Sequence, residues 1–582
     1  MGFSKDLSKL ENLSDFFGAS VLYRHALFLL LSLFVIGITG YYFGTFDQAI
    51  HIPFLKKILD PTLYPNDPFF ALRDTHYSYF WYIFYPFAQG GALELSLFFV
   101  HFSATYLSFV GIWRLTKTLF NDNLTTVLGV IAFSFPHIGF AAFPVFEFSL
   151  LNRTFALPFL LFSIDWYLKK QYLKSFVLLG LLGNIHALSV NFVLFMFGVD
   201  LLFRFWQERS SMERKLQLSL GMAGFILASL PVLLWKFGKS SFDFTFRPEW
   251  FDVISQSLMY TVFYPLSTSP TVLLLTLGGV SSFVLYLLAT RHRHHSPPSH
   301  SVTHFFYAAI FLIGLEVLVS FWLPVTFLVQ FQIVRIGIFT FIFAYLFFLH
   351  GLVKRMKSGT ISPSQFVMQY ASLFLAVTAL IPLLVEVMMR IIPTRDRVIA
   401  GWFAVVTSLV ACIILVWQTH IWRPGIYIFP QKTDWYDVQV WAKNNTPKDA
   451  MFLTPPDRWW FFEPDWRVFS ERSTFVTLSE VLEFAFTPEY TPHWVSRFTI
   501  AAPGALEQFD GDVYKSLKLT KEAYASQSDK QLSVLALVND IDYIVVEKPR
   551  RLPYPLVYEN RTFSVFRVSP AFASVFRREV DK

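Results

Sequence analysis

The chain has 582 residues, of which 54% are hydrophobic and 15% are charged, and its net charge is +7. Soluble proteins contain about a quarter charged residues, and the apolar residues here fall in long runs, which excludes an ordinary cytosolic enzyme. The 69 Phe, 25 Tyr and 16 Trp residues exclude a disordered chain. The single cysteine, Cys412, excludes an intramolecular disulfide and a cysteine zinc cluster.

Apolar runs long enough to cross a bilayer occur along the first 420 residues, since a spanning helix needs about 20 apolar residues. They cover 25–44, 92–113, 123–143, 150–168, 187–204, 216–236, 270–290, 303–323, 335–353, 363–389 and 397–419. A shorter run over 173–186 is interrupted by Gly180, Gly183 and Asn184 and predicts a broken helix. We therefore expect a polytopic α-helical membrane protein with about 11–13 transmembrane helices.

Lysine and arginine in the short loops indicate which helix ends lie in the cytoplasm. Basic residues at 114–117, 169–174, 204–215, 291–293 and 354–357 predict cytoplasmic loops, which makes 45–91 the first outer loop. No nucleic-acid recognition motif accompanies these residues, so we expect no nucleic-acid partner. Arg390, Arg395 and Arg397 conflict with the pattern, because counting the runs places them outside. Either one run between 354 and 397 does not cross, or these arginines serve a site or lipid headgroups.

The composition changes near residue 425, where prolines and acidic residues follow the last apolar run. Helical patterns at 437–445 and 516–539 mix with strand patterns at 450–453 and 542–546, and residues 556–568 alternate as a hairpin does. We therefore divide the chain into a polytopic transmembrane domain over 1–424 and a soluble α/β domain over 425–582. This second domain contains no glycine-rich nucleotide-binding motif.

The outer loop over 45–91 contains the first candidate site. Asp47 follows the first run at the membrane surface, and His51 lies one helical turn later, so a helix would direct both side chains the same way. A partly desolvated carboxylate there would act as a general base toward a hydroxyl acceptor. It would alternatively hold a divalent metal that steadies a departing phosphate oxygen. Asp67 is the second metal candidate, although its N-D-P sequence also explains it as a turn residue.

Three further charged residues lie at predicted outer membrane boundaries. Glu147 and Arg153 are six residues apart in apolar sequence, where ionisable groups pair or line a cavity. Arg335 lies where another run begins, and a guanidinium fits a phosphate group. The alternatives are a structural Glu–Arg pair and an arginine that only reaches the interface. His186, at the predicted helix break, is more often satisfied by a neighbour than catalytic.

Two segments carry a resemblance to a known class of enzymes. WAKNNTPKDAMFLTPP, residues 441–456, is similar to the W-x-x-x-N-T-P segment that opens the C-terminal domain of GT-C membrane glycosyltransferases. FDQAIHIPF, residues 46–54, occupies the position of their catalytic loop acid. The segment over 441–456 also resembles an uncharacterised bacterial integral membrane family with a C-terminal WAKxNTPxDAxF domain. Two motifs of these enzymes are incomplete in this chain. PPDRWWFF, residues 455–462, lacks the D-Y-G of oligosaccharyltransferases, and Asp47 is not followed by a second acid, as it is in their first loop.

The resemblance implies a GT-C-like fold and the transfer of a sugar from a polyprenyl-phosphate donor to an extracytoplasmic acceptor. Asp47 would be catalytic, and His51, Glu147, Arg153 and Arg335 would bind the substrate. The cofactor is left open, with Mg²⁺ or Mn²⁺ as the candidate. The expected partners are the lipid-linked donor and membrane lipids, and the expected location is the plasma (inner) membrane with the C-terminal domain outside. The alternative is a non-catalytic protein, either a scaffold for envelope-polymer assembly or a transporter.

Overall fold

The computed structural model describes residues 2–138, 143–207, 212–239, 243–257, 270–291, 297–375, 378–393, 396–419, 422–459 and 462–569. Within these ranges, eight helical segments are long and apolar enough to cross a membrane. They contain α2 (Val21–Thr39), α5 (Leu93–Phe120), α8 (Tyr172–Gln207), α9 (Met212–Lys239), α11 (Pro270–Thr290), α12 (Pro297–Phe321), α14 (Gly337–Lys357) and α17 (Arg397–Thr419). Exposed apolar side chains such as Leu22, Leu227 and Trp417 face outward from them, a surface suited to lipid. The chain is a multi-pass membrane protein.

Shorter helices complete the membrane part and the outer loop. Those beside the spans are α1 (Gly2–Ala19), α6 (Asn123–Ala132), α7 (Asn152–Leu168), α10 (Pro248–Ser257), α13 (Thr326–Gln330), η4 (Ile333–Ile336), α15 (Pro363–Ser372) and α16 (Leu380–Ile391). The outer loop contains β1 (Tyr41–Tyr42), α3 (Gln48–Leu59), η1 (Pro68–Thr75), η2 (Trp81–Phe84) and α4 (Tyr85–Gln89). Helix α14 is buried along nearly its whole length and lies at the centre of the largest apolar core.

Helix α8 is broken at His186, which has the non-helical angles φ −148° and ψ 79°. The chain turns back there, because the rings of Phe176 and Phe197 are 6.0 Å apart, whereas a continuous helix would separate them by about 30 Å. The tip of this helical hairpin is bonded to the outer loop: Tyr79 N–H donates to the Asn184 carbonyl at 2.9 Å. The helix break that the sequence predicts is confirmed, and it lies beneath the outer loop.

The run expected to span over 363–389 is instead two short helices, α15 and α16. Ten and twelve residues extend about 15 and 18 Å, too little to cross a bilayer. The end of α16 returns to the end of α14, because Arg355 and Arg390 both bind Glu386. The run over 363–389 therefore does not cross the membrane, so Arg390 lies at the same end of the bundle as Arg355, and its position no longer conflicts with the pattern of basic loops. Arg395 lies outside the described residues.

The C-terminal elements form a small α/β unit around a five-stranded sheet with strand order β4-β3-β5-β7-β6. Its strands are β3 (Met451–Leu453), β4 (Ser473–Thr474), β5 (Tyr543–Glu547), β6 (Leu556–Glu559) and β7 (Phe563–Arg567), preceded by β2 (Ile426–Tyr427). Its helices are α18 (Asp434–Asn445), α19 (Trp466–Ser470), η5 (Leu478–Glu480), α20 (Val481–Phe484), η6 (Pro488–Tyr490), α21 (Thr491–Ala501), η7 (Leu506–Gln508), α22 (Val513–Ser526) and α23 (Asp529–Val538). Strands β4, β3 and β5 are parallel, whereas β7 is antiparallel to β5 and to β6.

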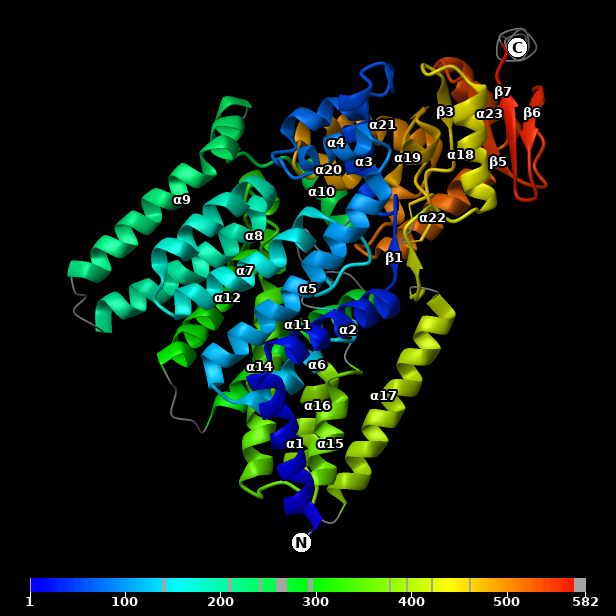
Figure 1. Ribbon diagram of the computed structural model, residues 1–582. Coiled ribbons are helices and arrows are strands. Elements are labelled where there is room, and N and C mark those ends of the chain that lie inside the picture. Colours follow the sequence, from blue (N-terminus) through cyan, green and yellow to red (C-terminus); the bar gives the residue numbers. More distant parts are fainter. Residues whose placement is uncertain are drawn as a thin grey trace.

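The predicted fold class, a polytopic helical membrane protein with a C-terminal α/β region, is confirmed, although the described residues contain eight candidate spans rather than about 11–13. The hairpin expected over 556–568 is β6 and β7, and the helix expected over 516–539 is two helices, α22 and α23. Figure 1 shows the C-terminal elements together with α3 and α4 at one end of the bundle, and α1 and α15 at the other. Helix α17 connects the two ends. The boundary at 424–425 stays a prediction.

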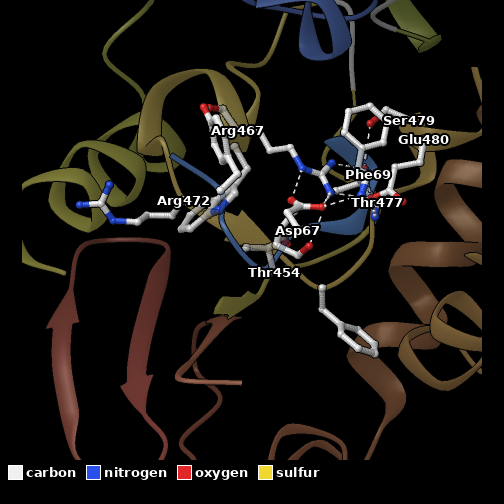
Figure 2. Close-up of polar contacts among 12 residues, drawn as sticks. Asp67, Phe69, Thr454, Arg467, Arg472, Thr477, Ser479 and Glu480 are labelled. Atoms are coloured by element: carbon white, nitrogen blue, oxygen red, sulfur yellow. Dashed lines mark hydrogen bonds and ion pairs between the residues drawn. The ribbon is translucent and has the colours of Figure 1, made fainter. Parts of the chain in front are cut away.

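A buried ion-pair cluster joins the outer loop to the C-terminal elements (Figure 2). Arg467 donates from Nε to Asp67 at 2.7 Å and from Nη2 to Glu480 at 2.7 Å, and all three side chains are at most 3% exposed. The Tyr490 hydroxyl donates to the other oxygen of Glu480. Burial raises the pKa of Glu480 although Arg467 lowers it. Since removing one partner of a buried pair is costly, this cluster fixes the outer loop to the C-terminal elements.

Candidate functional site

Asp47 is positioned at the start of α3 by contacts on both sides of it. The preceding residue, Phe46, has a φ of +48°, a conformation that non-glycine residues rarely adopt and that marks local strain. Its ring stacks on Trp459 of the C-terminal elements, with centroids 5.0 Å apart and planes at 4°. The following residue, Gln48, is fully buried and donates to the Leu150 carbonyl at 3.0 Å. Asp47 is therefore fixed against the segment that leads into α7.

Arg153, in the first turn of α7, links the two acidic candidates. Its Nη1 donates to Oδ2 of Asp47 at 2.8 Å, and its Nε donates to Oε1 of Glu147 at 2.6 Å. Asp47 is 8% exposed and Glu147 is 5% exposed. One guanidinium thus holds two carboxylates that are 100 residues apart in sequence, which is charge-assisted bonding of the strong kind.

Arg335 lies beside Arg153 with an aromatic ring in contact with both. The guanidinium carbons of Arg335 and Arg153 are 4.3 Å and 5.2 Å from the ring centroid of Phe143. Arg335 belongs to η4, which follows Gln332 in the left-handed conformation (φ +45°, ψ +54°). This break between α13 and α14 directs Arg335 toward the site, and contact with an aromatic face stabilises a cation.

A cavity of about 40 Å³ lies among these charged residues. Its polar lining consists of Glu147, Arg153, Thr154, His186, Ser189 and Arg335, and its apolar lining includes Phe143, Leu157 and Phe339. The tip of the α8 hairpin therefore contributes His186, whose Nδ1 is 2.8 Å from the Ser189 hydroxyl. The volume holds about three water molecules, so a sugar enters only if the surrounding elements separate.

Two buried oxygen atoms at or near the site accept no hydrogen bond from the described residues. Oδ1 of Asp47 is buried and has no hydrogen-bond partner among the described residues, and the same holds for Oε1 of Gln332. Burial raises the pKa of Glu147, and the charge of Asp47 raises it further, whereas Arg153 and Arg335 lower it; the net shift is upward. An upward shift of this pKa favours the neutral form of Glu147, which reduces the negative charge that faces Arg153 and Arg335.

His51 lies behind Asp47, next to a second histidine. The centroid of its ring is 5.1 Å from that of Trp81, on which it stacks, and 4.8 Å from that of His76. Burial lowers the pKa of His51 well below its ordinary value, and the charges of His76 and Arg153 lower it further. His76 binds Glu483 at 3.0 Å; burial lowers its pKa, but Glu483 outweighs burial, so the net pKa is raised.

Of the six predicted site residues, the structure brings four together, places His51 beside them and places Asp67 apart. Asp47, Glu147, Arg153 and Arg335 surround one cavity or bind its lining, and His51 lies next to them in α3. Asp67 is instead bound by Arg467 (Figure 2). Across the described ranges, no group of three or more His, Cys, Asp or Glu side chains has the arrangement of a metal site.

Sequence reasoning does not identify Phe143, Trp459 or the pair of His76 and Glu483 as parts of this region. Phe143 is one of 69 phenylalanines, and nothing in its local pattern distinguishes it. His76 and Glu483 are 407 residues apart, so only the folded chain shows that they pair. The one available signal was the sequence RWWFF, in which Trp459 lies.

A family model described as a domain of unknown function, DUF6798, matches residues 433–500. This segment begins just before α18 and ends within α21. No protein of the curated collection matches the chain.

Two solved structures are similar to the chain at low sequence identity. One is the archaeal oligosaccharyltransferase AglB from Archaeoglobus fulgidus in complex with an inhibitory peptide and a dolichol-phosphate, at 13% identity and a TM-score of 0.37. The match covers 90% of this chain and 69% of that one. The other is the oligosaccharyltransferase of Archaeoglobus fulgidus in the apo form, at 11% identity, a TM-score of 0.38 and coverages of 90% and 70%. TM-scores this low carry no argument about activity.

Proposed function

We propose that the chain is a membrane glycosyltransferase of the GT-C type, which transfers a sugar from a polyprenyl-phosphate donor to a hydroxyl acceptor on the outer side of the plasma (inner) membrane. The observation that supports it is one cavity lined by Glu147, Arg153 and Arg335, with Asp47 bound to Arg153, at the end of the bundle beneath the outer loop. An anionic donor headgroup and a carboxylate base are the two things that such a transfer requires.

Asp47 is the base in this proposal. Its Oδ2 is held by Arg153, and its Oδ1 is buried without a hydrogen-bond partner among the described residues. Oδ1 accepts the proton of the acceptor hydroxyl while the oxygen of that hydroxyl bonds to the anomeric carbon of the sugar. The strained backbone at Phe46 and the stack on Trp459 keep the carboxylate in place.

The two arginines stabilise the leaving group. As the bond between the anomeric carbon and the phosphate oxygen breaks, the phosphate departs with the bonding electron pair and gains negative charge. Arg335 and Arg153, both against Phe143, are aimed at this charge before it develops, and such preorganised charge is the main electrostatic contribution to catalysis.

The donor reaches the cavity from the bilayer in this proposal, with its polyprenyl tail between helices and its headgroup beneath the outer loop. A divalent cation such as Mg²⁺ bound by Asp47 would assist the departure of the phosphate. The non-catalytic alternative, a scaffold or a transporter, explains the membrane helices but assigns no role to the unpaired oxygen of Asp47.

The test uses the full-length chain reconstituted in liposomes with a polyprenyl-phosphate hexose and a membrane extract as the source of acceptor. D47N should bind the donor, measured by native mass spectrometry, but transfer sugar at least about 100-fold more slowly, because general-base catalysis contributes roughly 10²–10⁴-fold. R335A should weaken donor binding about tenfold and leave the binding of the corresponding polyprenol, which lacks phosphate, unchanged.

Two exposed residues of the outer loop give matched controls. Asp60 pairs with Lys448 at the surface, and Arg73 is 38% exposed; D60N and R73A should retain wild-type transfer and donor binding. Undiminished transfer by D47N, or equal binding of the phosphate and the polyprenol by the wild-type chain, would contradict the proposal and favour a non-catalytic protein.

A further inference from the structure

A second and larger cavity lies at the opposite end of the bundle. It has a volume of about 250 Å³ and lies between the C-terminal ends of α11, α14 and α16. Helix α11 packs against both other helices, and the Arg355–Glu386 ion pair joins α14 to α16. Arg335 and Arg355 are separated by the length of α14, about 30 Å, which is the thickness of the hydrocarbon part of a bilayer. The two cavities therefore open near opposite faces of the membrane.

The polar side of this cavity has more positive than negative charge. Glu386 is 1% exposed and binds Arg355 at 2.9 Å and Arg390 at 2.8 Å. Gln369 donates to the same carboxylate at 2.6 Å. Lys354 also lines the cavity, and its ammonium makes no ion pair with another described residue. Three cations face one carboxylate, so the lining carries a net charge of +2.

Glu386 binds both guanidinium groups, but its single negative charge offsets only one of the three cations. It holds the two guanidinium groups from α14 and α16 side by side along the cavity wall, and a guanidinium bound to a carboxylate keeps further N–H groups that can donate to a phosphate. A purely structural ion pair would need only one of the two arginines. The excess of positive charge therefore indicates an anionic ligand.

The other side of the cavity is apolar and continuous with the outer surface of the bundle. Leu288 and Phe348 line it. Leu287, one residue earlier on α11, is 60% exposed, and Leu384 on α16 is 49% exposed. Exposed apolar side chains of membrane helices contact acyl chains. A ligand in this cavity thus meets cations at one end and lipid-facing surface at the other.

We propose that this cavity binds the phosphate group of an anionic phospholipid, with the phosphate between Lys354, Arg355 and Arg390 and the acyl chains along α11 and α16. Basic pockets between membrane helices bind lipid headgroups in this way. The site is separate from the one that contains Asp47. A free phosphate ester has the same recognising group, so the experiment must distinguish the two sources.

The experiment measures binding to the full-length chain in a non-ionic detergent by native mass spectrometry. The probes are phosphatidylglycerol, zwitterionic phosphatidylcholine and glycerol phosphate. The wild-type chain should retain phosphatidylglycerol in preference to phosphatidylcholine. K354A and R390A should each weaken phosphatidylglycerol about fivefold, and the double variant about 25-fold, since each basic residue contributes on the order of one factor of this size. Competition by millimolar glycerol phosphate identifies a soluble ligand, and its failure identifies the lipid.

The matched control is K174A. Lys174 is an exposed lysine at the start of α8, at a helix end that the sequence also predicts to be cytoplasmic, but it does not line the cavity. K174A should bind phosphatidylglycerol as the wild-type chain does. Equal affinity of K354A and wild type overturns the proposal, and so does an equal loss in K174A, which would indicate general attraction to a basic surface. Lys354 has no described ion pair to lose, so K354A tests the site even if R390A lowers stability.

Discussion

At the scale of single residues, the candidate site depends on how one arginine is shared. Arg153 binds both Asp47 and Glu147, and both carboxylates are buried. Two buried carboxylates that share one guanidinium repel each other, which favours protonation of one of them. Burial raises the pKa of Glu147, and the neighbouring charge of Asp47 raises it further.

The raised pKa of Glu147 predicts how donor binding depends on pH. A polyprenyl-phosphate hexose contains a phosphodiester, whose single charge does not change above the acidic range. As the pH rises through the elevated pKa of Glu147, above its ordinary 4.5, the new carboxylate repels the donor, so the affinity should fall by about fivefold, which corresponds to roughly 1 kcal/mol of charge repulsion. Affinity of the wild-type chain, measured by native mass spectrometry across the pH series, should show this loss.

E147Q cannot ionise at this position and should bind the donor with a nearly constant affinity over the same range. Because the raised pKa means that the folded chain binds a proton more tightly than the unfolded chain, the contribution of Glu147 to stability falls as the pH rises, and E147Q should not share that loss. A pH profile identical in E147Q and wild type would show that another group titrates.

At the scale of elements, two departures from straight helices shape the molecule. Helix α8 turns back at His186, and its tip both contacts the outer loop and lines the cavity. Helices α15 and α16 enter the bundle and return to the end where α14 finishes. Each departure places polar side chains at one face of the membrane, His186 at one end and Glu386 with Arg390 at the other. Irregular backbone at such depth is tolerated where it is buried in protein or lines a cavity.

The α15–α16 hairpin predicts which side of the membrane its flanking residues occupy. The chain has a single cysteine, so C412S provides a cysteine-free background for labelling with a membrane-impermeant maleimide. Ser358 and Asp396 are both exposed and flank the hairpin; S358C and D396C should react from the same side. A single span over 363–389 would place them on opposite sides.

D60C supplies the reference for the opposite face, because Asp60 belongs to the outer loop and is 37% exposed. It should react in right-side-out vesicles under conditions in which S358C and D396C are protected. Reaction of D396C together with D60C, but not with S358C, would show that the hairpin crosses the membrane.

At the scale of the whole molecule, the outer loop and the C-terminal elements behave as one structural unit. Residues of α3 and η1 share an apolar core with the C-terminal sheet and helices. Strand β1 is parallel to β2, with Tyr41 opposite Ile426, and the Asp67–Arg467–Glu480 cluster lies between the two regions (Figure 2). Because Asp47 lies in this loop, its position depends on the C-terminal elements, which are hundreds of residues away in sequence.

This coupling predicts the cost of breaking the cluster. R467A leaves two buried carboxylates without their cation, so the free energy of unfolding should fall by about 3–5 kcal/mol, seen as a lower melting temperature in detergent. K448A removes the exposed pair with Asp60, whose side chains are 54% and 37% exposed, and should change stability by less than about 1 kcal/mol. Similar melting temperatures for R467A and K448A would mean that the cluster does not hold the loop.

The class of the protein, most of its helices and the small C-terminal sheet were predictable from the sequence. The bilayer sets the length of an apolar run, and strand alternation is a local pattern, so both can be read without contacts. Charged residues such as Arg153 and Arg335 were identifiable for the same reason, because few ionisable groups occur in such apolar surroundings. The hairpin of α15 and α16 was not, since a mostly apolar run over 363–389 looks the same whether it crosses or turns back.

The tertiary structure alone decided which of these residues meet. Asp47 is 106 residues from Arg153, and Asp67 is 400 residues from Arg467; both acids lie in one outer loop, and their local sequences do not tell which joins the cavity and which joins the buried cluster. The same holds for Glu386, whose partners come from α14 and α15 as well as from its own helix. Such pairings depend on how helices pack around α14, and packing is a property of the whole chain rather than of any segment.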